Sequence, residues 1–480
     1  MRALTLIALI LATALSTNAH SAGITASRQS AASKQARAGE TEFRALYKEL
    51  VEINTTLSAG SCTDAATAMK ARLAAAGYSD ADMQVIVPES WPKQGNLVAL
   101  LPGTDKKLKP VLLLAHIDVV EARRADWVRD PFKLVEEDGF FYARGSSDDK
   151  AMAAVFADMM VRYKRENYRP KRGIRLALTC GEETPNVFNG VKYLIEHHRA
   201  LVDAQFALNE GGGGRYDQDT GEYRFVSVLA AEKLYQDFTL TTTNEGGHSS
   251  RPMPDNAIYQ LAHALDKIEA YSFPIEFSDV TRPYFEKFGA IEGGEKGKDM
   301  IAAASGDEAA IGRIRKDPSN NAILHTNCVA TQINGGHAPN ALPQRATANV
   351  NCRIFPGHQQ EEIRQQLIKV IDDPAVSVEF QSTPENPGAP PPMSRDILGP
   401  VEALSHDMYP GIAVIPSMSS GATDCRFLTP AGVACYGISG MLSDGATSNA
   451  HGLNERIRVQ TLIEGREFLY RLTKDYAGGK

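Results

Sequence analysis

The stretch Val111-Leu-Leu-Leu-Ala-His-Ile-Asp118 decides how the rest of this 480-residue sequence is interpreted. Its five apolar residues follow a turn containing lysine and proline, which is typical of a strand buried on both faces of a sheet. His116 and Asp118 come directly after this strand. Residues two apart in an extended chain point the same way, so the Asp118 carboxylate can support the His116 imidazole, as carboxylates do for metal-binding histidines. By itself, such a triplet is more often a pair of ordinary surface residues.

Strand-like and helical patterns alternate on both sides of this stretch. Residues 151–163 are rich in Ala and Met at helical spacing, and residues 173–179 and 206–208 are further apolar runs. This alternation predicts an α/β domain with a mostly parallel sheet. Because open α/β sheets bind ligands at the carboxyl ends of their strands, the position of His116 favours a role in binding.

The pattern changes near residue 237. Residues 237–243 alternate and are β-branched, a helix is expected at about 255–271, residues 272–320 are less regular, and strands are expected at about 323–333 and 345–355. These features predict an inserted α+β domain at residues 237–356, which interrupts an α/β domain made of residues 41–236 and 357–480. A chain of this length is also too long for one compact core.

The N-terminus has the order of a secretory signal peptide: Met1-Arg2, an apolar run at residues 3–15 and small residues at 16–22. We expect residues 1–22 to be a signal peptide cleaved between about Ala19 and Ala22, and residues 23–40 to be a polar, disordered leader. The protein would then be secreted or periplasmic. A membrane anchor is the alternative, but the apolar run is too short to span a bilayer comfortably.

Composition excludes several other classes of protein. The formal net charge is -7 with both signs interspersed, and no basic patch with interleaved aromatics is present, which argues against a nucleic-acid partner. The six cysteines form no C-x-x-C pair, so a zinc knuckle or redox motif is not expected. Cysteines of an exported protein can be oxidised. Cys328 and Cys352 lie equally far from Asn340 in two strand-like runs, so they can face each other across a ladder, although two buried thiols would give the same sequence.

Four further groups of polar residues end strands or lie in loops: Asp148-Asp149, Glu182-Glu183, Glu210 and His451. Each has an ordinary alternative, such as helix capping for Asp148 or a plain loop histidine for His451. Adjacent carboxylates such as Glu182 and Glu183, however, repel each other unless a cation lies between them. Two histidines with several carboxylates predict a site for two zinc-like ions that share one carboxylate and leave a position open for water.

Taken in order, the motifs resemble the aminoacylase/carboxypeptidase family of two-zinc metallopeptidases (peptidase family M20), which includes dipeptidases and desuccinylases. The similarity runs from about residue 41 to 472. The matching pieces are Leu-Ala-His116-Ile-Asp118-Val-Val, Tyr-Ala-Arg-Gly-Ser-Ser-Asp148-Asp-Lys150, Thr-Cys-Gly-Glu182-Glu183, Asn-Glu210-Gly-Gly, Gly-Gly-His248-Ser-Ser-Arg-Pro and His451-Gly-Leu-Asn-Glu455. The resemblance implies a metallopeptidase domain carrying an inserted lid or dimerisation domain.

Carried over by position, the resemblance implies that His116, Asp148 and Glu210 hold one metal, and that Asp148, Glu183 and His451 hold the other. Asp148 would bridge two Zn²⁺ ions, with Co²⁺ or Mn²⁺ as alternatives. Glu182 falls at the general base, which takes a proton from water held by the metals and passes it to the leaving amine. Asp118 would orient His116.

The resemblance also assigns roles within the inserted domain. His248 falls at a residue that, in family members, reaches the partner subunit's active site to stabilise the oxyanion, which implies a homodimer. Asn340 and Arg353 fall where the family grips the substrate carboxylate. Without the resemblance, His248 would be a loop histidine and Arg353 a solvated strand residue. The chain departs from the family in having Ala-Arg-Gly before Asp148 and Lys150-Ala151 after it, and residues 272–320 match nothing assignable.

The sequence thus predicts a hydrolase that cleaves a peptide or N-acyl amide bond next to a free carboxylate, with a small peptide or an N-acyl amino acid as substrate. A dedicated N-deacylase of the desuccinylase kind and a non-catalytic peptide-binding protein are the alternatives. Glu182 argues against the second alternative, because a binding protein needs no general base. No G-x-S-x-G motif occurs, which disfavours a serine hydrolase.

Overall fold

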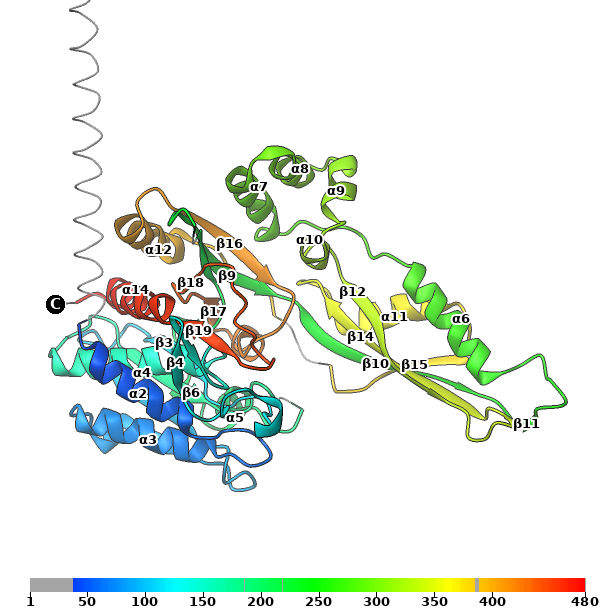
Figure 1. Ribbon diagram of the computed structural model, residues 1–480, viewed down its shortest axis with the longest axis horizontal. Helices are drawn as coiled ribbons and strands as arrows, with labels where there is room; N and C mark the ends of the chain where they lie inside the picture. Colours follow the sequence, from blue (N-terminus) through cyan, green and yellow to red (C-terminus); the bar gives the residue numbers. More distant parts are fainter. Residues whose placement is uncertain (1–37, 185, 218, 385–387, 480) are drawn as a thin grey trace, which may run out of the picture.

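The computed structural model describes residues 38–184, 186–217, 219–384 and 388–479, arranged as a rounded first unit and an elongated second unit (Figure 1). The expected signal peptide and nearly all of the expected leader lie outside the described residues. Glu40, the last residue of that leader, is instead the first residue of helix α2 (Glu40–Glu52). Among the described residues, no helix combines the length and apolarity needed to cross a membrane.

The first unit is built on a large sheet with strand order β1-β2-β6-β3-β7-β17-β9-β8-β18, and β16 pairs with β9 outside this path. Strands β6, β3, β7 and β17 at its centre are parallel neighbours, which confirms the predicted α/β class with a mostly parallel sheet. The strands are β1 (Met83–Ile86), β2 (Asn96–Leu101), β3 (Val111–His116), β6 (Ile174–Thr179), β7 (Phe206–Asn209), β8 (Gly213–Tyr216), β9 (Tyr223–Glu232), β16 (Ala413–Ser419), β17 (Ala434–Gly437) and β18 (Leu442–Ser443). A small second sheet joins β19 (Arg456–Arg458), β5 (Phe140–Tyr142) and β4 (Val135–Glu137).

Strand β3 is buried on both faces, as its unbroken apolar sequence predicts. Leu113 and Ala115 belong to a large core that includes residues of helices α2 and α4, whereas Leu112 and Leu114 belong to a separate core with residues of α5 and α13. Alternate side chains of β3 therefore pack into the two cores on opposite faces of the sheet. The helices of this unit are α2, α3 (Cys62–Ala75), α4 (Lys150–Arg165), α5 (Gly190–His197), α12 (Arg395–Met408), α13 (Cys425–Leu428) and α14 (Val459–Ala477).

The second unit is a four-stranded antiparallel sheet with order β12-β14-β10-β15. Its chain order is β10 (Leu234–Thr243), α6 (Ala257–Ala270), β12 (Asn327–Gly335), β14 (Arg345–Ile354), α11 (Gln360–Ile371) and β15 (Val376–Phe380), a ferredoxin-like arrangement. A short two-stranded antiparallel ladder of β11 (Gly247–His248) and β13 (Ala341–Leu342) lies at its far end (Figure 1). The expected boundary at residue 356 is therefore wrong, because β15 pairs with β10 and α11 shares a hydrophobic core with α6.

Residues 272–320, which gave no regular pattern, form four helices: α7 (Thr281–Glu292), α8 (Gly294–Ala304), α9 (Glu308–Ile314) and α10 (Pro318–Ala322). They have a core of their own around Phe285 and Met300. Lys287 Nζ donates a hydrogen bond of 3.1 Å to the Val414 carbonyl, and the Phe288 and Phe225 rings lie 5.4 Å apart. These helices therefore contact the first unit, although their sequence lies within the second.

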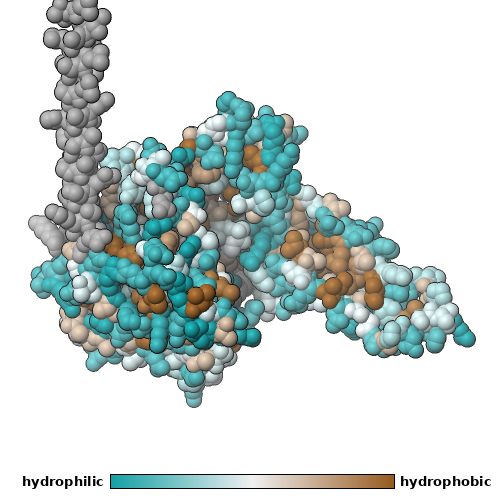
Figure 2. All heavy atoms as spheres, in the orientation of Figure 1, coloured by the Kyte–Doolittle hydropathy of each residue, from teal (hydrophilic) through white to brown (hydrophobic). Residues whose placement is uncertain are grey.

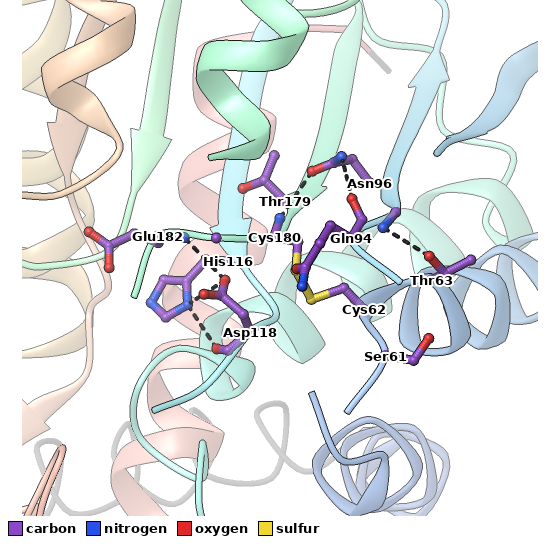
Figure 3. Close-up of a disulfide and its surroundings, with 12 residues drawn as sticks. Ser61, Cys62, Thr63, Gln94, Asn96, His116, Asp118, Thr179, Cys180 and Glu182 are labelled. Atoms are coloured by element: carbon purple, nitrogen blue, oxygen red, sulfur yellow. Dashed lines mark hydrogen bonds and ion pairs between the residues drawn. A yellow bond between two sulfur atoms is a disulfide. The ribbon is translucent and has the colours of Figure 1, made fainter. Parts of the chain in front are cut away.

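All six cysteines form disulfides: Cys62–Cys180, Cys328–Cys352 and Cys425–Cys435. The expected pairing of Cys328 with Cys352 is confirmed, since the two face each other across the β12–β14 ladder. The other two disulfides join residues whose sequence spacing carries no pairing signal. Cys62–Cys180 ties the start of α3 to the loop after β6 (Figure 3).

Candidate metal centre

The residues predicted to bind metal come together at one edge of the large sheet. His116 ends β3, Glu183 follows β6 and Glu210 follows β7, and these three strands are parallel neighbours. Their carboxyl ends therefore lie at the same edge, where α/β sheets bind ligands. Asp148 comes from the loop that enters α4, and His451 from the loop before β19.

The ligand atoms form two groups that share Asp148. Asp148 Oδ1 lies 3.2 Å from His116 Nε2, and the same nitrogen lies 3.8 Å from Glu210 Oε2. Asp148 Oδ2 lies 3.1 Å from His451 Nε2, which in turn lies 3.0 Å from Glu183 Oε1. Within each group, the ligand atoms all lie within 4.8 Å of one another. One carboxylate thus presents one oxygen to each group, as a bridging ligand would.

Carboxylates outnumber histidines at this edge, and the imbalance shows in their pKa values. Burial and the neighbouring Glu210 raise the pKa of Asp149 well above its ordinary value, and burial raises that of Glu182 to about 10. Burial opposes protonation of His116, yet the nearby Glu210, Asp118 and Asp148 raise its pKa well above the usual range. Divalent cations would cancel this repulsion. Nitrogen and oxygen donors in this number also suit Zn²⁺ and its neighbours, so the residues fit two metal ions.

Asp118 contacts His116 with both its side chain and its backbone, and its Oδ1 lies 3.6 Å from His116 Nδ1. His116 Nδ1 donates a hydrogen bond of 3.1 Å to the backbone carbonyl of Asp118, which leaves Nε2 free to bind a metal. The Asp118 carboxylate also accepts hydrogen bonds from the backbone N–H groups of Glu182 and Glu183, at 3.3 and 3.1 Å. Figure 3 shows His116, Asp118 and Glu182 next to one another. Asp118 therefore fixes the Glu182-Glu183 loop against His116.

Glu182 belongs to neither group of ligand atoms. Its loop is held on one side by Asp118 and on the other by Cys180, whose backbone N–H donates to Asn96 Oδ1 at 3.0 Å (Figure 3). The disulfide from Cys180 to Cys62 adds a covalent tie. A carboxylate placed beside the metal ligands but outside both groups is free to accept a proton.

Arg144 and Glu455 form a buried ion pair that the sequence does not predict. Arg144 Nη1 donates to Glu455 Oε2 at 2.6 Å, and the two residues are 2% and 0% exposed. Glu455 also accepts the backbone N–H groups of Gly145, Ser147 and Asp148, at 3.1, 2.8 and 3.0 Å. Arg144 Nη2 donates to the carbonyl of Gly452 at 3.0 Å, next to His451. The pair thus connects the loop that carries Asp148 to the loop that carries His451.

The predicted substrate residues lie at opposite ends of the second unit. His248 pairs with Ala341 in the β11–β13 ladder at the far end, and the Asn340 carbonyl accepts the Ser249 N–H at the same end. Arg353 pairs with Tyr235 at the other end of the sheet, where the chain leaves the first unit. The eight residue steps from Arg345 to Arg353 in β14 correspond to about 27 Å. Asn340 and Arg353 of one chain therefore do not meet on one carboxylate in this structure.

Comparison with known proteins agrees with this geometry. Residues 112–475 match the sequence model described as Peptidase family M20/M25/M40. The chain belongs to this family. Mouse N-fatty-acyl-amino acid synthase/hydrolase PM20D1 is 26% identical over 385 residues, which cover 78% of this chain and 76% of the mouse protein. This chain is therefore an M20 hydrolase, related to peptidases and N-acyl amino acid hydrolases.

Two solved structures show the same fold. The M20 metallo-carboxypeptidase Sso-CP2 of Sulfolobus solfataricus superposes with a TM-score of 0.68 at 19% identity, covering 91% of this chain and 99% of that one. A Bacillus subtilis protein described as a dinuclear metal-binding peptidase of the M20 family gives a TM-score of 0.57 at 11% identity, covering 91% and 98%. At these identities, the structural similarity shows the fold of this chain and not its chemistry.

Proposed function

We propose that this M20 protein uses two metal ions to hydrolyse a peptide or N-acyl amide bond next to a free carboxylate. The observation that carries the proposal is the sharing of Asp148 between two groups of one histidine and two carboxylates. Glu182 beside them belongs to neither group, which suits a general base. Zn²⁺ fits this donor set, with Co²⁺ or Mn²⁺ as alternatives.

In this proposal, two bound cations would activate water and polarise the scissile carbonyl. His116, Asp148 and Glu210 would hold one cation, and Asp148, Glu183 and His451 would hold the other. Glu182 accepts the proton from the attacking water at its carboxylate and returns it to the leaving nitrogen. The Asp118 carboxylate accepts the backbone N–H groups of Glu182 and Glu183 and so keeps Glu182 in place. Proton transfer therefore occurs at a fixed position.

We propose that Arg353 binds the substrate carboxylate. It lies at the end of β14 nearest the first unit, with its guanidinium 4.6 Å from the centre of the Tyr235 ring. It forms no ion pair among the described residues, although the charge of Asp237 acts on it, and a guanidinium matches a carboxylate in shape and charge. The mouse relative is named for N-fatty-acyl-amino acids, substrates with such a carboxylate.

We infer that the active protein is a homodimer in which His248 and Asn340 serve the partner's site. In their own chain both lie at the far end of the second unit (Figure 1). Strand β12 is an edge strand, and Val329 and Ile333 on it are 56% and 66% exposed. Figure 2 shows hydrophobic residues gathered on this unit near α6 and β12. An exposed edge with apolar side chains is suited to pairing with a second copy.

We also propose that the protein is exported after cleavage between about Ala19 and Ala22, to the periplasm or the medium. The charged, apolar and small-residue order of residues 1–22 supports this proposal. Three disulfides among the described residues agree with an oxidising compartment.

Glu182→Gln tests the proposed chemistry directly. The variant should retain both metals while kcat falls about 10²- to 10⁴-fold, because proton transfer is lost and no ligand is removed. The measurement is turnover of dipeptides and N-acyl amino acids by the Zn²⁺-loaded protein, together with metal analysis. Glu196→Gln, on the exposed surface of α5, is the matched control. A Glu182→Gln variant that keeps most of its rate would contradict the assigned role.

A further inference from the structure

The peptide unit between Gly181 and Glu182 leads into the proposed general base and is held at both of its polar groups. Its N–H, which belongs to Glu182, donates to Asp118 Oδ1 at 3.3 Å. Its carbonyl, which belongs to Gly181, accepts Asn189 Nδ2 at 3.2 Å. Gly181 has a φ of 93°, and glycine populates positive and negative φ about equally readily. The backbone alone therefore does not fix the plane of this peptide, whereas the two hydrogen bonds do.

The Asn189 amide that holds this carbonyl is itself held by Asp424. Asn189 Nδ2 carries two hydrogens, and its second donation goes to Asp424 Oδ1 at 2.6 Å. Asn189 Oδ1 accepts the Lys192 N–H at 2.9 Å and so caps helix α5. An amide rotated by half a turn would direct Oδ1 at two other oxygens, the Gly181 carbonyl and the Asp424 carboxylate. Asp424 therefore fixes which way the amide points, and with it the hydrogen bond to Gly181.

Asp424 occupies a buried and well-anchored position in the loop after β16. Its side chain accepts the hydroxyl of Thr179, the last residue of β6, at 3.3 Å, and the residue is 2% exposed. The Cys425–Cys435 disulfide begins at the next residue and ties this loop to β17. Asp424 is not among the proposed metal ligands, and it has no hydrogen bond to Glu182 among the described residues. It can therefore act on the position of Glu182 only through intervening groups.

We propose that Asp424 is a positioning residue for Glu182: it orients the Asn189 amide, which together with Asp118 sets the plane of the peptide entering Glu182. A general base has to lie within about 2.6–3.2 Å of the group whose proton it takes. Rotation of this peptide would move Glu182 out of that range, whereas the Glu183 N–H would stay bound to Asp118 Oδ2. This inference rests on the proposed function, because it takes Glu182 as the general base.

A double-mutant cycle with Glu182 tests this role. Asp424→Ala should lower kcat of the Zn²⁺-loaded protein about 10- to 100-fold, with KM little changed and both metals bound, because only the base is displaced. In the Glu182→Gln background, the same change should cause no further loss of kcat, because the base that Asp424 positions has already been removed. A residue that only supports the fold would lower kcat by the same factor in both backgrounds.

A conservative variant separates the hydrogen bonds of Asp424 from its bulk. Asp424→Asn keeps an oxygen for the Asn189 amide and places an NH₂ group against the Thr179 hydroxyl, which can accept it. This variant should therefore recover most of the kcat that Asp424→Ala loses. The matched control is Asp158→Asn, which removes a buried carboxylate paired with Arg466 in α4 and α14. It should lower the free energy of unfolding and leave kcat unchanged.

Asn189→Asp replaces Asp424→Ala if the latter does not fold. It keeps the cap of α5 but removes the donor to the Gly181 carbonyl, so it should lower kcat with the same dependence on Glu182. Wild-type kcat in these variants, equal losses in both backgrounds, loss of bound metal, or no recovery in Asp424→Asn would overturn the positioning role and leave the proposed function standing. A Glu182→Gln variant that keeps most of its rate would instead contradict the proposed function itself.

Discussion

Glu455→Gln should destabilise the first unit by about 3–5 kcal/mol, the usual cost of breaking a buried ion pair by removing one partner. In the native chain, Glu455 Oε2 accepts from Arg144 and Gly145, and Oε1 accepts from Ser147 and Asp148. A glutamine can offer only one oxygen. Whichever way its amide points, the NH₂ group faces two N–H donors, so two hydrogen bonds to a charged acceptor are lost, at about 1.5–3 kcal/mol each.

The same substitution should weaken metal binding, because the pair connects the loops that carry Asp148 and His451. The measurements are denaturant unfolding of the metal-free protein and competitive Zn²⁺ titration. Glu402→Gln, which breaks the surface pair with Arg395, is the control and should cost about 0–1 kcal/mol. The double variant Arg144→Met/Glu455→Met should lose less than the sum of the two single changes. Unchanged stability and unchanged Zn²⁺ affinity in Glu455→Gln would refute the reasoning.

Three further outcomes are expected. Arg353→Ala should raise KM for substrates with a free carboxylate and have little effect on amidated analogues in steady-state assays; equal losses on both would show that Arg353 does not bind that group. His248→Ala and Glu182→Ala should each be nearly inactive, yet a co-expressed mixed dimer should regain activity at its one complete site, and a purified mixed dimer without activity would rule out action across the dimer. Cys62→Ser/Cys180→Ser should lower the free energy of unfolding by about 2–5 kcal/mol, because it removes a disulfide that joins residues 118 positions apart. The variant should also have a lower kcat, because this disulfide lies next to the Glu182 loop. Cys425→Ser/Cys435→Ser removes a disulfide between residues 10 positions apart and should cost less in the same unfolding assay.

The fold class and the grouping of the metal-site residues could be predicted because both follow from local patterns. Each parallel strand is an apolar run, and His116, Glu183 and Glu210 stand directly after three such runs. Since parallel strands end at one edge, side chains far apart in sequence are expected together there. The pairing of Cys328 with Cys352 followed from the same kind of argument, applied to two strands placed evenly about a turn.

Features that depend on distant partners could not be predicted in this way. The Arg144–Glu455 pair joins residues 311 positions apart, and neither residue has a pattern that marks it as buried. The boundary at residue 356 was misplaced because α11 and β15 look like another α/β pair until β15 is seen beside β10. The hydrogen bonds from the Asp118 carboxylate to the backbone of Glu182 and Glu183 could not be predicted either, because those residues lie 64 and 65 positions away.

The order of the ligands along the chain makes the two metal groups unequal. His116, Asp148 and Glu210 all precede the second unit, so their group is complete within the first part of the catalytic domain. The other group requires His451, which follows the second unit and is presented in a left-handed backbone conformation with φ of 61°. Such a conformation persists in a residue other than glycine only where its surroundings enforce it. Arg144 and Glu455 provide part of that enforcement from both sides of the insertion. Docking of the C-terminal segment onto the sheet therefore supplies a ligand to the second group, and the hydrogen bond from the Asp148 N–H to Glu455 also supports the ligand that both groups share.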